Sequence, residues 1–440
     1  MKITVIAGNG IGGTEKAAFI YAAELARRGH QVSALTNADG PRSSTLLEAG
    51  VRIEEIPFTS TTLQEHFADF KPDIVHQHVS GYSDQRALYE AIDRFPGKRP
   101  KIIETNVFGR LMDRHDRNHV SFRMFVSLAS GCQAFQRPMV EMTRPELERH
   151  SVLSNPLSSY HPPTAEVRAG IRRELGILPG DFLIIRLGRP GGKWTSWDCE
   201  AFSIARKKDP SMKLLLMEPS AELTAEIRRG RWGNGIIIHK ASSDFDFISN
   251  LYGSADGMIH ASDYGESFGY TLAEAMQAGL PIITLSTPWG DNAQVQLVRN
   301  GITGYVCCST RGMAGAALKI RGREEIRKRM SEQARAHISG ICDLSRDTDL
   351  LEEIMASVTG STPGPLMKKQ FEEWMAYRNN TFDVAQNDLD DHHSKLSVAG
   401  WKLYDSYRRT KTALRHAIER RRQRGTSPEI SGRHTETTAP

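Results

Sequence analysis

The chain has 440 residues, of which 39% are hydrophobic and 25% are charged, as in globular proteins that bury more than one core. No stretch approaches the about 18 apolar residues that span a membrane, and the five cysteines lack C-x-x-C spacing, which argues against a disulfide framework and a cysteine metal site. The net charge of +5 reflects a basic segment, 400–425. The short apolar start before Gly8 does not resemble a signal peptide, so we expect a cytoplasmic protein.

The first part of the chain alternates apolar strands with helical patterns, an order that is typical of a parallel sheet covered by helices. The expected strands are Ile3–Ala7, Gln31–Thr36, Arg52–Ile56, Asp73–His76 and Lys101–Glu104. The expected helices are Lys16–Arg28 and a segment near Gln85–Phe95, and a polar connection is expected between Ile56 and Asp69. In such sheets, loops at the carboxyl ends of the strands face the ligand.

A glycine-rich turn follows the first expected strand. Gly8, Gly10 and Gly13 have the spacing of a dinucleotide-binding fingerprint, and Asp39 near the end of the next strand could hold a ribose. The same spacing also occurs wherever a turn needs positive φ or a close backbone approach. An NAD(P)-dependent oxidoreductase therefore stays open as an alternative at this point.

Polar residues accumulate after the fourth and fifth expected strands. His76 and His78 lie close together in a strand, where we expect the rings on opposite faces, one packed and one lining the ligand crevice. No third ligand is placed by spacing, so a metal site is not expected. The stretch 110–123, rich in Arg, His and Asp, fits a solvated helix face or a surface for an anionic or polyhydroxylated acceptor equally well.

A proline-containing linker, 158–164, precedes a second alternation of strands and helices. Its first helix is expected at Ala165–Leu175, and its strands are expected at Asp181–Leu187, Lys213–Glu218, Gly235–His239, Gly257–Ala261 and Pro281–Leu285. Asp244 and Asp246 have the spacing of a D-x-D metal motif, but Asp244 directly precedes a helical run. We therefore expect Asp244 to cap a helix rather than to bind a metal.

Charged residues follow two of these strands. Arg189 and Lys193 lie in a glycine-rich turn, where they could bind a diphosphate, although cations in surface turns are also common. Glu266 precedes a glycine turn, and Glu274 lies in the expected helix Thr271–Ala278 that follows, whose N-terminus would attract phosphate. Two carboxylates beside such a terminus suit a ligand that has both phosphate and hydroxyl groups.

The run Glu266–Glu274 with the following AMQAGLPIIT resembles the E-x7-E signature of GT4-type retaining glycosyltransferases, also called glycosyl transferases group 1, which have the GT-B fold. Gly12-Gly13-Thr14-Glu15 resembles the GG-x-E segment that opens these enzymes, and 188–193 resembles their GR…K element. The resemblance covers about residues 1–355. It implies an α/β fold with two Rossmann-like, doubly wound parallel-sheet domains that face a central cleft.

The resemblance also implies an order of domains along the chain. Residues 1–160 would bind the acceptor, and residues 161–345 would bind the nucleotide-sugar. A crossing helix would follow from residue 346. Beyond it the family gives no guide, and the helical pattern and composition of the sequence itself predict a basic helical extension up to residue 425 and a disordered tail at 426–440.

Each matched residue receives an implied role from the same resemblance. Catalysis is assigned to Glu266, Arg189 and Lys193. Donor binding is assigned to Gly12, Gly13, His239, Lys240, Ser267, Phe268, Gly269, Tyr270 and Glu274. Contact with the acceptor or the transferred sugar is assigned to Thr14, Glu15, His78 and Asn106. Asn106 stands near the position where relatives have His, and Gln294 or Asn292 stands where they have Glu. An Asn cannot exchange a proton near pH 7.

The expected function is transfer of a sugar, with retention, from a nucleotide-sugar to a glycan or a lipid-linked acceptor in polysaccharide biosynthesis of the cell envelope. Neither a metal nor a cofactor other than the nucleotide-sugar co-substrate is expected. The basic amphipathic segment 398–424 is interpreted first as a helix packed on the protein, then as a peripheral membrane contact, and last as a nucleic-acid tail, so no nucleic-acid partner is expected. A non-catalytic nucleotide-sugar-binding protein is a further alternative, because Asn106 and Gln294 depart from the pattern.

Overall fold

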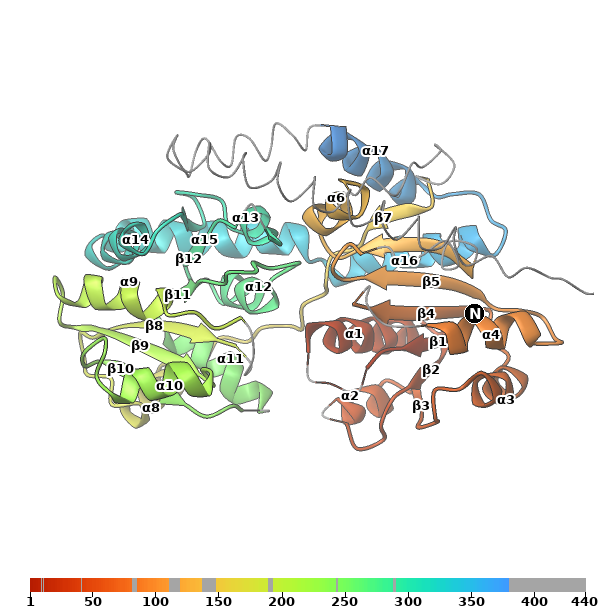
Figure 1. Cartoon of the computed structure of the whole chain (residues 1–440), viewed down its shortest axis with the longest axis horizontal. Helices are drawn as coiled ribbons and strands as arrows, with labels where there is room; N and C mark the ends of the chain where they lie inside the picture. The colour runs from red at the N-terminus through yellow and green to blue at the C-terminus, as the bar shows by residue number, and fades with distance from the viewer. Residues whose placement is uncertain are drawn as a thin grey trace, which may run out of the picture. The chain divides into compact units, whose positions relative to one another are not determined.

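A computed structural model of the chain describes residues 1–8, 10, 12–40, 42–80, 85–110, 119–136, 148–188, 193–242, 244–287 and 290–379. Within these residues the strands form two parallel sheets, one of seven strands in the order β3-β2-β1-β4-β5-β6-β7 and one of six in the order β10-β9-β8-β11-β12-β13 (Figure 1). In each sheet the chain starts in an inner strand and winds outward in one direction and then in the other. The expected fold of two Rossmann-like, doubly wound sheets is therefore confirmed.

Most strands and helices begin and end within a few residues of the expected positions. The first sheet consists of β1 (Lys2–Ile6), β2 (Gln31–Leu35), β3 (Arg52–Glu54), β4 (Ile74–Val79), β5 (Lys101–Asn106), β6 (Val120–Phe125) and β7 (His150–Val152). The second sheet consists of β8 (Phe182–Leu187), β9 (Met212–Met217), β10 (Ile236–His239), β11 (Gly257–His260), β12 (Ile282–Leu285) and β13 (Gly304–Cys307).

Helices connect the strands of both sheets. Those before the second sheet are α1 (Gly13–Arg27), α2 (Ser43–Glu48), α3 (Ser60–Phe70), α4 (Arg86–Arg94), α6 (Leu128–Gln136) and α8 (Ala165–Glu174). Those that follow are α9 (Trp197–Arg206), α10 (Ala221–Arg228), α11 (Phe245–Ser254), α12 (Tyr270–Gln277), α13 (Gln294–Leu297), α14 (Thr310–Gly322), α15 (Glu324–Ile341), α16 (Leu344–Val358) and α17 (Pro365–Asn379). The expected cap is also present, because the Asp244 carboxylate accepts hydrogen bonds from two N–H groups of the first turn of α11.

The core of the first sheet contains side chains that are far apart in the sequence. Ile3 and Val5 of β1 are buried, and α1 packs on the same cluster through Ala18, Ala22 and Leu25. Helix α16 adds the buried side chains Leu350, Leu351, Ile354 and Met355 to this cluster. The chain therefore returns to the first sheet after it has completed the second one.

The second sheet is buried on both faces, as expected for parallel strands that are continuous apolar runs. Alternate residues of β8 show this directly, because successive side chains of a strand point to opposite faces. Leu183 and Ile185 pack with α11, α12 and α15, whereas Ile184 packs with α9 and α14. Arg186, which follows Ile185 in β8, is charged and almost fully buried. Its partners belong to the candidate active site.

The connection 56–69 is not the polar loop expected from the sequence, because α3 forms there. The Thr59 hydroxyl accepts a hydrogen bond from an N–H of the first turn, and Leu63 and Phe67 are buried at helical spacing. The many polar residues of the exposed face hide this spacing when the sequence is read alone.

The stretch 110–123 does not form a single helix, because its last residues belong to β6. Arg123 of this strand is buried and pairs with Glu104 of β5, with 2.5 Å between its Nε and the carboxylate. Pairing with β5 is a long-range contact, which explains why local charge spacing misled the prediction. Residues 111–118 lie outside the described part of the chain.

His76 and His78 lie on the same face of β4, which corrects the expectation of opposite faces. Their ring centroids are 4.2 Å apart, and both side chains are buried. Side chains two residues apart in a strand share a face, because the direction alternates at every residue. His76 Nε2 lies 2.9 Å from the hydroxyl of Thr105, whereas neither ring nitrogen of His78 has a hydrogen-bond partner among the described residues.

Helix α17 is the last described element, and its Trp374 is buried near His150 of β7. Within the described ranges, no helix is both long enough and apolar enough to cross a membrane. The segments 398–424 and 426–440, for which a basic helix and a disordered tail are expected, lie outside the described residues.

Candidate active site

Glu266 lies in the loop between β11 and α12, and a glycine fixes the shape of this loop. Gly265 has a φ of 66°, and a Cβ at this position would lie 1.5 Å from the carbonyl oxygen of Asp291. Glycine alone tolerates both the backbone conformation and the close contact. The N–H of Asp291 donates to the carbonyl oxygen of Tyr264 at 2.9 Å, so the loop is held against the segment that precedes α13.

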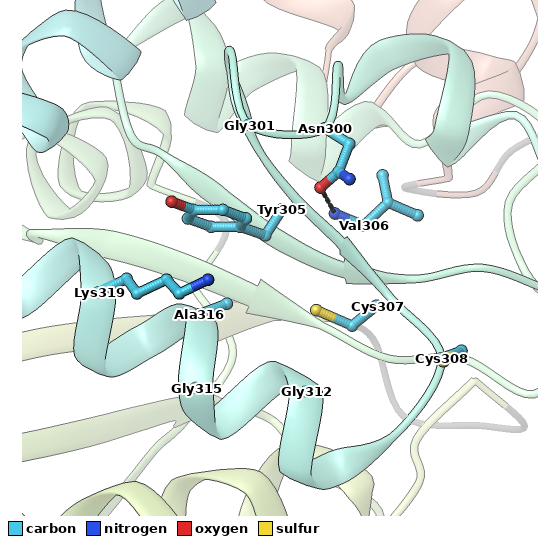
Figure 2. Close-up of a pocket in the computed structure, with 10 residues that line it drawn as sticks. All are labelled: Asn300, Gly301, Tyr305, Val306, Cys307, Cys308, Gly312, Gly315, Ala316 and Lys319. Atoms are coloured by element: carbon cyan, nitrogen blue, oxygen red, sulfur yellow. Dashed lines mark hydrogen bonds between the residues drawn. The ribbon is translucent and has the colours of Figure 1, made fainter. Parts of the chain in front are cut away.

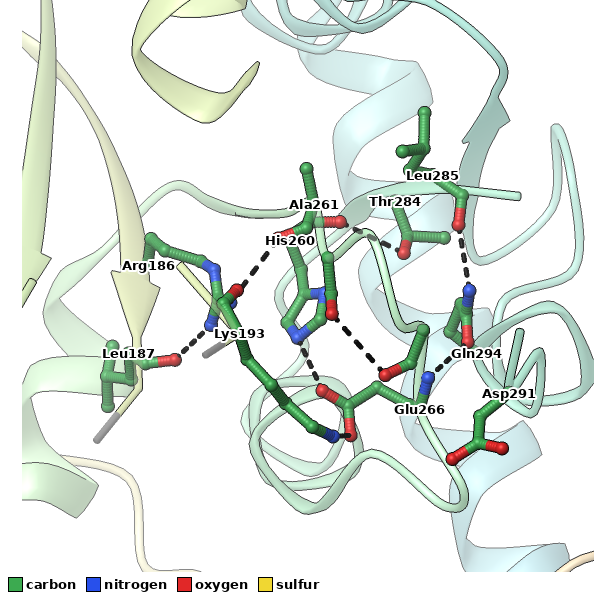
Figure 3. Close-up of polar contacts among 12 residues, drawn as sticks. Arg186, Leu187, Lys193, His260, Ala261, Glu266, Thr284, Leu285, Asp291 and Gln294 are labelled. Atoms are coloured by element: carbon green, nitrogen blue, oxygen red, sulfur yellow. Dashed lines mark hydrogen bonds and ion pairs between the residues drawn. The ribbon is translucent and has the colours of Figure 1, made fainter. Parts of the chain in front are cut away.

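The carboxylate of Glu266 has two partners, which Figure 3 shows on either side of it. Lys193 Nζ lies 2.6 Å from Oε2, and His260 Nε2 lies 3.0 Å from Oε1. Burial by itself would raise the pKa of Glu266, but the charge of Lys193 and the hydrogen bond from His260 hold this pKa well below its ordinary value. Glu266 is therefore ionised at neutral pH, and its remaining lone pairs can accept hydrogen bonds from hydroxyl groups.

A buried ion pair supports both partners of Glu266. Arg186 of β8 and Asp198 of α9 are 3.3 Å apart between Nε and Oδ2, and both are almost completely buried. Asp198 Oδ1 also accepts a hydrogen bond from the backbone N–H of Ala261 at 2.9 Å, and Arg186 lies 4.8 Å from the ring centroid of Trp194. Burial raises the pKa of Asp198 to about 6. The pair links the segment that carries Lys193 to the end of β11.

Gln294 positions the backbone of Glu266 and uses its whole amide group to do so (Figure 3). Its Oε1 accepts a hydrogen bond from the N–H of Glu266 at 3.0 Å. Its Nε2 donates to the carbonyl oxygen of Leu285 at 2.9 Å and to the hydroxyl of Thr287 at 2.7 Å. A carboxylate could not donate these two hydrogen bonds, so the amide suits this position.

Helix α12 begins directly after Gly269, whose φ is 98°. No side chain of the described residues caps this terminus, so the positive end of the helix dipole can attract an anion. Phe268 is buried, and the carbonyl oxygen of Ser267 accepts a hydrogen bond from the Ser127 hydroxyl at 2.6 Å. The expected donor-binding segment 267–270 therefore forms the entry to this helix.

Glu274 lies on α12 and already has partners for both carboxylate oxygens. It forms an ion pair with Lys16 of α1, and the hydroxyl of Tyr252 donates to its Oε2 at 2.9 Å. Lys16 Nζ also lies 5.1 Å from the ring centroid of Tyr270. Helices α1 and α12 belong to different sheets, so Glu274 is a point at which the two sheets are connected.

The glycine turn before α1 is packed against the side chain of Glu15. A Cβ on Gly8 would lie 2.8 Å from Glu15 Oε1, and one on Gly10 would lie 3.1 Å from it. A Cβ on Gly13 would lie 2.8 Å from the ring of Tyr270. A carboxylate next to these glycines repels the pyrophosphate of a dinucleotide, so the turn does not favour NAD(P).

Asn106 is the last residue of β5, and its amide closes the loop that follows. Its Nδ2 donates to Glu104 Oε1 at 3.1 Å and to the carbonyl oxygen of Arg110 at 2.9 Å, while its Oδ1 accepts from the N–H of Arg110 at 3.2 Å. Gln77 Nε2 donates to the other oxygen of Glu104 at 2.8 Å. The amide therefore organises the loop, and its contact with a sugar stays a prediction.

The structure describes some of the other expected site residues and not others. His239 ends β10, and its Nδ1 lies 2.7 Å from the carbonyl oxygen of Lys240. Gly12 precedes α1, and Thr14 lies in the first turn of that helix. Arg189 lies outside the described residues, so its role stays a prediction.

Several residues of this region do not stand out in the sequence, among them His260, Lys16 and Asp291. His260 ends an apolar strand and therefore resembles a core residue, and Lys16 is 258 residues away from Glu274 in the chain. Burial raises the pKa of Asp291, although the hydrogen bond with Gln133 and the charge of Lys193 act in the opposite direction. Lys16 and Asp291 are identified by contacts with distant parts of the chain, and His260 by its contact with Glu266 across the loop after β11, whereas no sequence motif identifies any of them.

A concavity outside the candidate active site lies along β13 and α14 and has a volume of about 470 Å³ (Figure 2). Its wall includes Tyr305, Cys307, Cys308 and Lys319, and the Lys319 ammonium lies 5.5 Å from the ring centroid of Tyr305. No residue expected in the active site lines it.

Comparison with known families identifies the kind of enzyme. Residues 199–337, which contain both Glu266 and Glu274, match the family model described as Glycosyl transferases group 1. The protein is therefore a glycosyltransferase. A search of curated proteins gives no match.

Solved structures show the fold of this glycosyltransferase. A glycosyltransferase from Rickettsia africae has a TM-score of 0.69 at 17% identity and covers 82% of this chain and 99% of its own. HepE from Anabaena in complex with UDP-glucose has a TM-score of 0.66 at 18% identity and covers 81% and 100%. WaaG, a glycosyltransferase involved in lipopolysaccharide biosynthesis, has a TM-score of 0.57 at 18% identity and covers 82% and 100%. These similarities support the GT-B fold.

Within the glycosyltransferase, the structure brings several expected residues together. Lys193 contacts Glu266, and the entry to α12 lies between Glu266 and Glu274. His78 and Asn106 belong to neighbouring strands of the first sheet. The roles assigned to these residues in catalysis, donor binding and acceptor binding stay predictions.

Proposed function

We propose that this glycosyltransferase transfers a sugar from a UDP-sugar to a hydroxyl group of a glycan or a lipid-linked acceptor, with retention of the anomeric configuration. One observation carries the proposal: the ionised and mostly buried carboxylate of Glu266 lies between Lys193 and His260 at the entry to an uncapped helix. Such an arrangement can hold sugar hydroxyls and a diphosphate side by side. The complex of HepE with UDP-glucose supports the choice of uracil as the base of the donor.

The reaction breaks the bond between the anomeric carbon and the diphosphate oxygen, and the electron pair stays on the diphosphate. The acceptor oxygen forms its bond to the anomeric carbon on the same face, and the acceptor proton moves to the leaving phosphate oxygen. Lys193 and the N-terminus of α12 stabilise the negative charge of the leaving group, together with Arg189. The loss of one such contact commonly costs about 10²–10³ in rate.

Glu274 has a separate role in this proposal, which is to accept hydrogen bonds from the ribose hydroxyls. Its Oε1 is paired with Lys16 and its Oε2 with Tyr252. Because a carboxylate has about four lone-pair sites, it can keep one partner while it accepts a ribose hydroxyl.

We also propose that transfer needs no metal or cofactor and takes place in the cytoplasm, with an acceptor of the cell-envelope type. The described involvement of WaaG in lipopolysaccharide biosynthesis supports this class of acceptor. The basic segment 398–424 is proposed as a helix packed on the protein, or otherwise as a peripheral contact with the inner face of the membrane.

A panel of nucleotide-sugars incubated with the pure protein tests the proposal. The expected result is slow release of UDP from one donor, which is lost in Glu266→Ala, together with thermal stabilisation by UDP. Stabilisation by UDP without release from any donor, even with candidate acceptors present, would instead indicate a non-catalytic nucleotide-sugar-binding protein. A response to a nicotinamide cofactor and to no nucleotide-sugar would contradict the proposal.

A further inference from the structure

The two partners of Glu266 differ in how firmly they are held. The side chain of Lys193 is 43% exposed, and the segment that carries it is a loop. The side chain of His260 is 3% exposed and belongs to the end of a strand. A long, exposed Lys side chain can change partners easily, whereas a buried imidazole on a strand cannot.

The position of His260 is fixed by its neighbours in the sheet. Strand β11 pairs with β8 on one side and with β12 on the other. The hydroxyl of Thr284 donates to the carbonyl oxygen of His260 at 3.1 Å. The next N–H, that of Ala261, donates to Asp198 at 2.9 Å. Both polar groups of the peptide unit that follows His260 are therefore hydrogen-bonded, and this restrains the backbone that carries the imidazole.

The hydrogen bond to Glu266 determines the tautomer of His260. An ionised carboxylate can accept hydrogen bonds but cannot donate them, so His260 Nε2 must carry the proton. The charged groups around the ring are Arg186 on β8, Lys193 in the loop after β8, Glu266 in the loop after β11, and Asp198 on α9 behind Arg186. Burial and the charge of Arg186 lower the pKa of His260 to about 4, so the ring is neutral at pH 7.

The diphosphate of a bound donor changes the situation of Lys193 but not that of His260. Lys193 is a mobile cation that would then have two anionic partners, the carboxylate of Glu266 and the leaving phosphate. A neutral imidazole gains nothing from a phosphate at a distance. When Lys193 turns to the diphosphate, His260 is the partner that stays on Glu266.

We propose that His260 is a positioning residue of this glycosyltransferase: its neutral imidazole, donating from Nε2, keeps the Glu266 carboxylate directed at the sugar while Lys193 engages the diphosphate. The inference rests on the proposed function for the presence of a nucleotide-sugar. It deepens that function, because it assigns the geometry of Glu266 to a residue that does not itself contact the substrate.

Two substitutions separate positioning from a merely structural role. His260→Gln places an amide donor near the position of Nε2, whereas His260→Leu removes the donor and keeps an apolar volume. We expect His260→Leu to lower kcat by about tenfold to hundredfold, with the affinity for UDP unchanged, and His260→Gln to recover most of kcat. Equal losses in both variants, or a loss of UDP affinity that matches the loss of kcat, would overturn the proposal.

His30→Leu is the matched control, because His30 also pairs with a glutamate, Glu352, at 2.7 Å. His30 precedes β2 and therefore lies at the end of the first sheet that is opposite to the carboxyl ends of the strands. We expect the kcat of His30→Leu to equal that of the unmodified enzyme. A fall in kcat as large as in His260→Leu would overturn the proposal, because it would show that the loss of a His–Glu pair away from the site suffices.

A measurement on the intact protein tests the geometry without any activity. Long-range ¹H–¹⁵N spectra of the histidine side chains, assigned with His260→Gln, are expected to show His260 as the Nε2–H tautomer, with a signal that changes in Glu266→Ala. An Nδ1–H tautomer, or a spectrum that Glu266→Ala leaves unchanged, would overturn the proposal. If the spectra agree but no donor is turned over, the proposed function has failed and the contact has not.

Discussion

Glu266 is both mostly buried and ionised, a combination that is stable only with partners that replace the lost water. Lys193 supplies the opposite charge and His260 supplies a hydrogen bond. A carboxylate prepared in this way is better suited to hold hydroxyl groups than to donate a proton. At the scale of single residues, the site therefore depends on a few polar contacts that are expensive to break.

Replacement of Glu266 by Ala is expected to lower transfer by at least about 10³-fold, since it removes the group that contacts the sugar. The affinity for UDP should stay within about twofold, because the proposed ribose and diphosphate contacts are retained. UDP release from the donor and calorimetric titration with UDP measure the two effects. Glu226→Ala on α10, which removes the exposed ion pair of Glu226 with Arg231, serves as the control. Equal loss of transfer and of UDP binding would contradict the role given to Glu266.

The stability of the protein is expected to depend on His76 at mildly acidic pH. Burial lowers the pKa of His76 from 6.5 to about 3, so the unfolded chain binds a proton there more readily than the native protein does. This stabilisation is complete above pH 6.5 and is lost as the pH falls toward 3. The contribution of His76 to the free energy of unfolding should be about 2 kcal/mol smaller at pH 5 than at pH 7.

Urea unfolding at pH 5 and at pH 7 measures this dependence. The difference between the free energies of unfolding at the two pH values should shrink by about 2 kcal/mol in His76→Gln, because the Gln side chain does not titrate in this range. An identical pH dependence in the variant and in the unmodified protein would show that His76 is not responsible.

At the scale of secondary-structure elements, turns after strands place the charged groups. Gly265 allows the loop after β11 to pack on Asp291, and Gly269 allows α12 to begin immediately afterwards. Both residues have positive φ, which is costly for a side chain with a Cβ. The distance between Glu266 and the entry to α12 therefore depends on two glycines.

Gly265→Ala is expected to abolish transfer. It should also destabilise the protein by more than the cost of placing a residue with a Cβ at positive φ. The comparison is Gly301→Ala, where φ is 74° but nothing lies within 4 Å of the added Cβ. The control should lose about 1–2 kcal/mol of stability. Gly265→Ala should lose more, because its Cβ would lie 1.5 Å from the carbonyl oxygen of Asp291. Thermal unfolding and UDP release measure both, and equal destabilisation of the two variants would contradict the assignment.

At the scale of the whole molecule, contacts between distant parts of the chain complete both sheets and the site. Helix α16 packs into the core of the first sheet, although it follows the second sheet in the sequence. The ion pair of Lys16 with Glu274 connects α1 to α12. Segments beyond the second sheet therefore contribute to the stability of the first.

Ile354→Ala in α16 tests this contribution, because Ile354 is fully buried in the cluster that contains β1 and α1. We expect a loss of about 2–5 kcal/mol in the free energy of unfolding, from the lost apolar contacts and the cavity left behind. Val167→Ala on α8, where Val167 is 40% exposed, should change stability by less than about 0.5 kcal/mol. Denaturant unfolding measures both, and a loss in Ile354→Ala as small as that in the control would show that α16 is not part of this core.

The amino-acid sequence by itself determined the alternation of strands and helices, the parallel sheets and the resemblance carried by the run from Glu266 to Glu274. These features are local, since apolar periodicity, glycine turns and helix caps act over a few residues. The helix α3 and the strand β6 were missed, because a polar exposed face hides the one and pairing with β5 creates the other.

Only the tertiary structure decided which groups meet. It placed His260 on Glu266, Lys16 on Glu274 and the carboxylate of Glu15 against the glycine turn. Lys16 and Glu274 are 258 residues apart in the chain, and the contacts of His260 and Glu15 depend on how a loop folds back on itself, so no spacing along the chain reveals them. The physical reason is that the folding of both sheets brings distant side chains into one place, where burial then sets their charge and their partners.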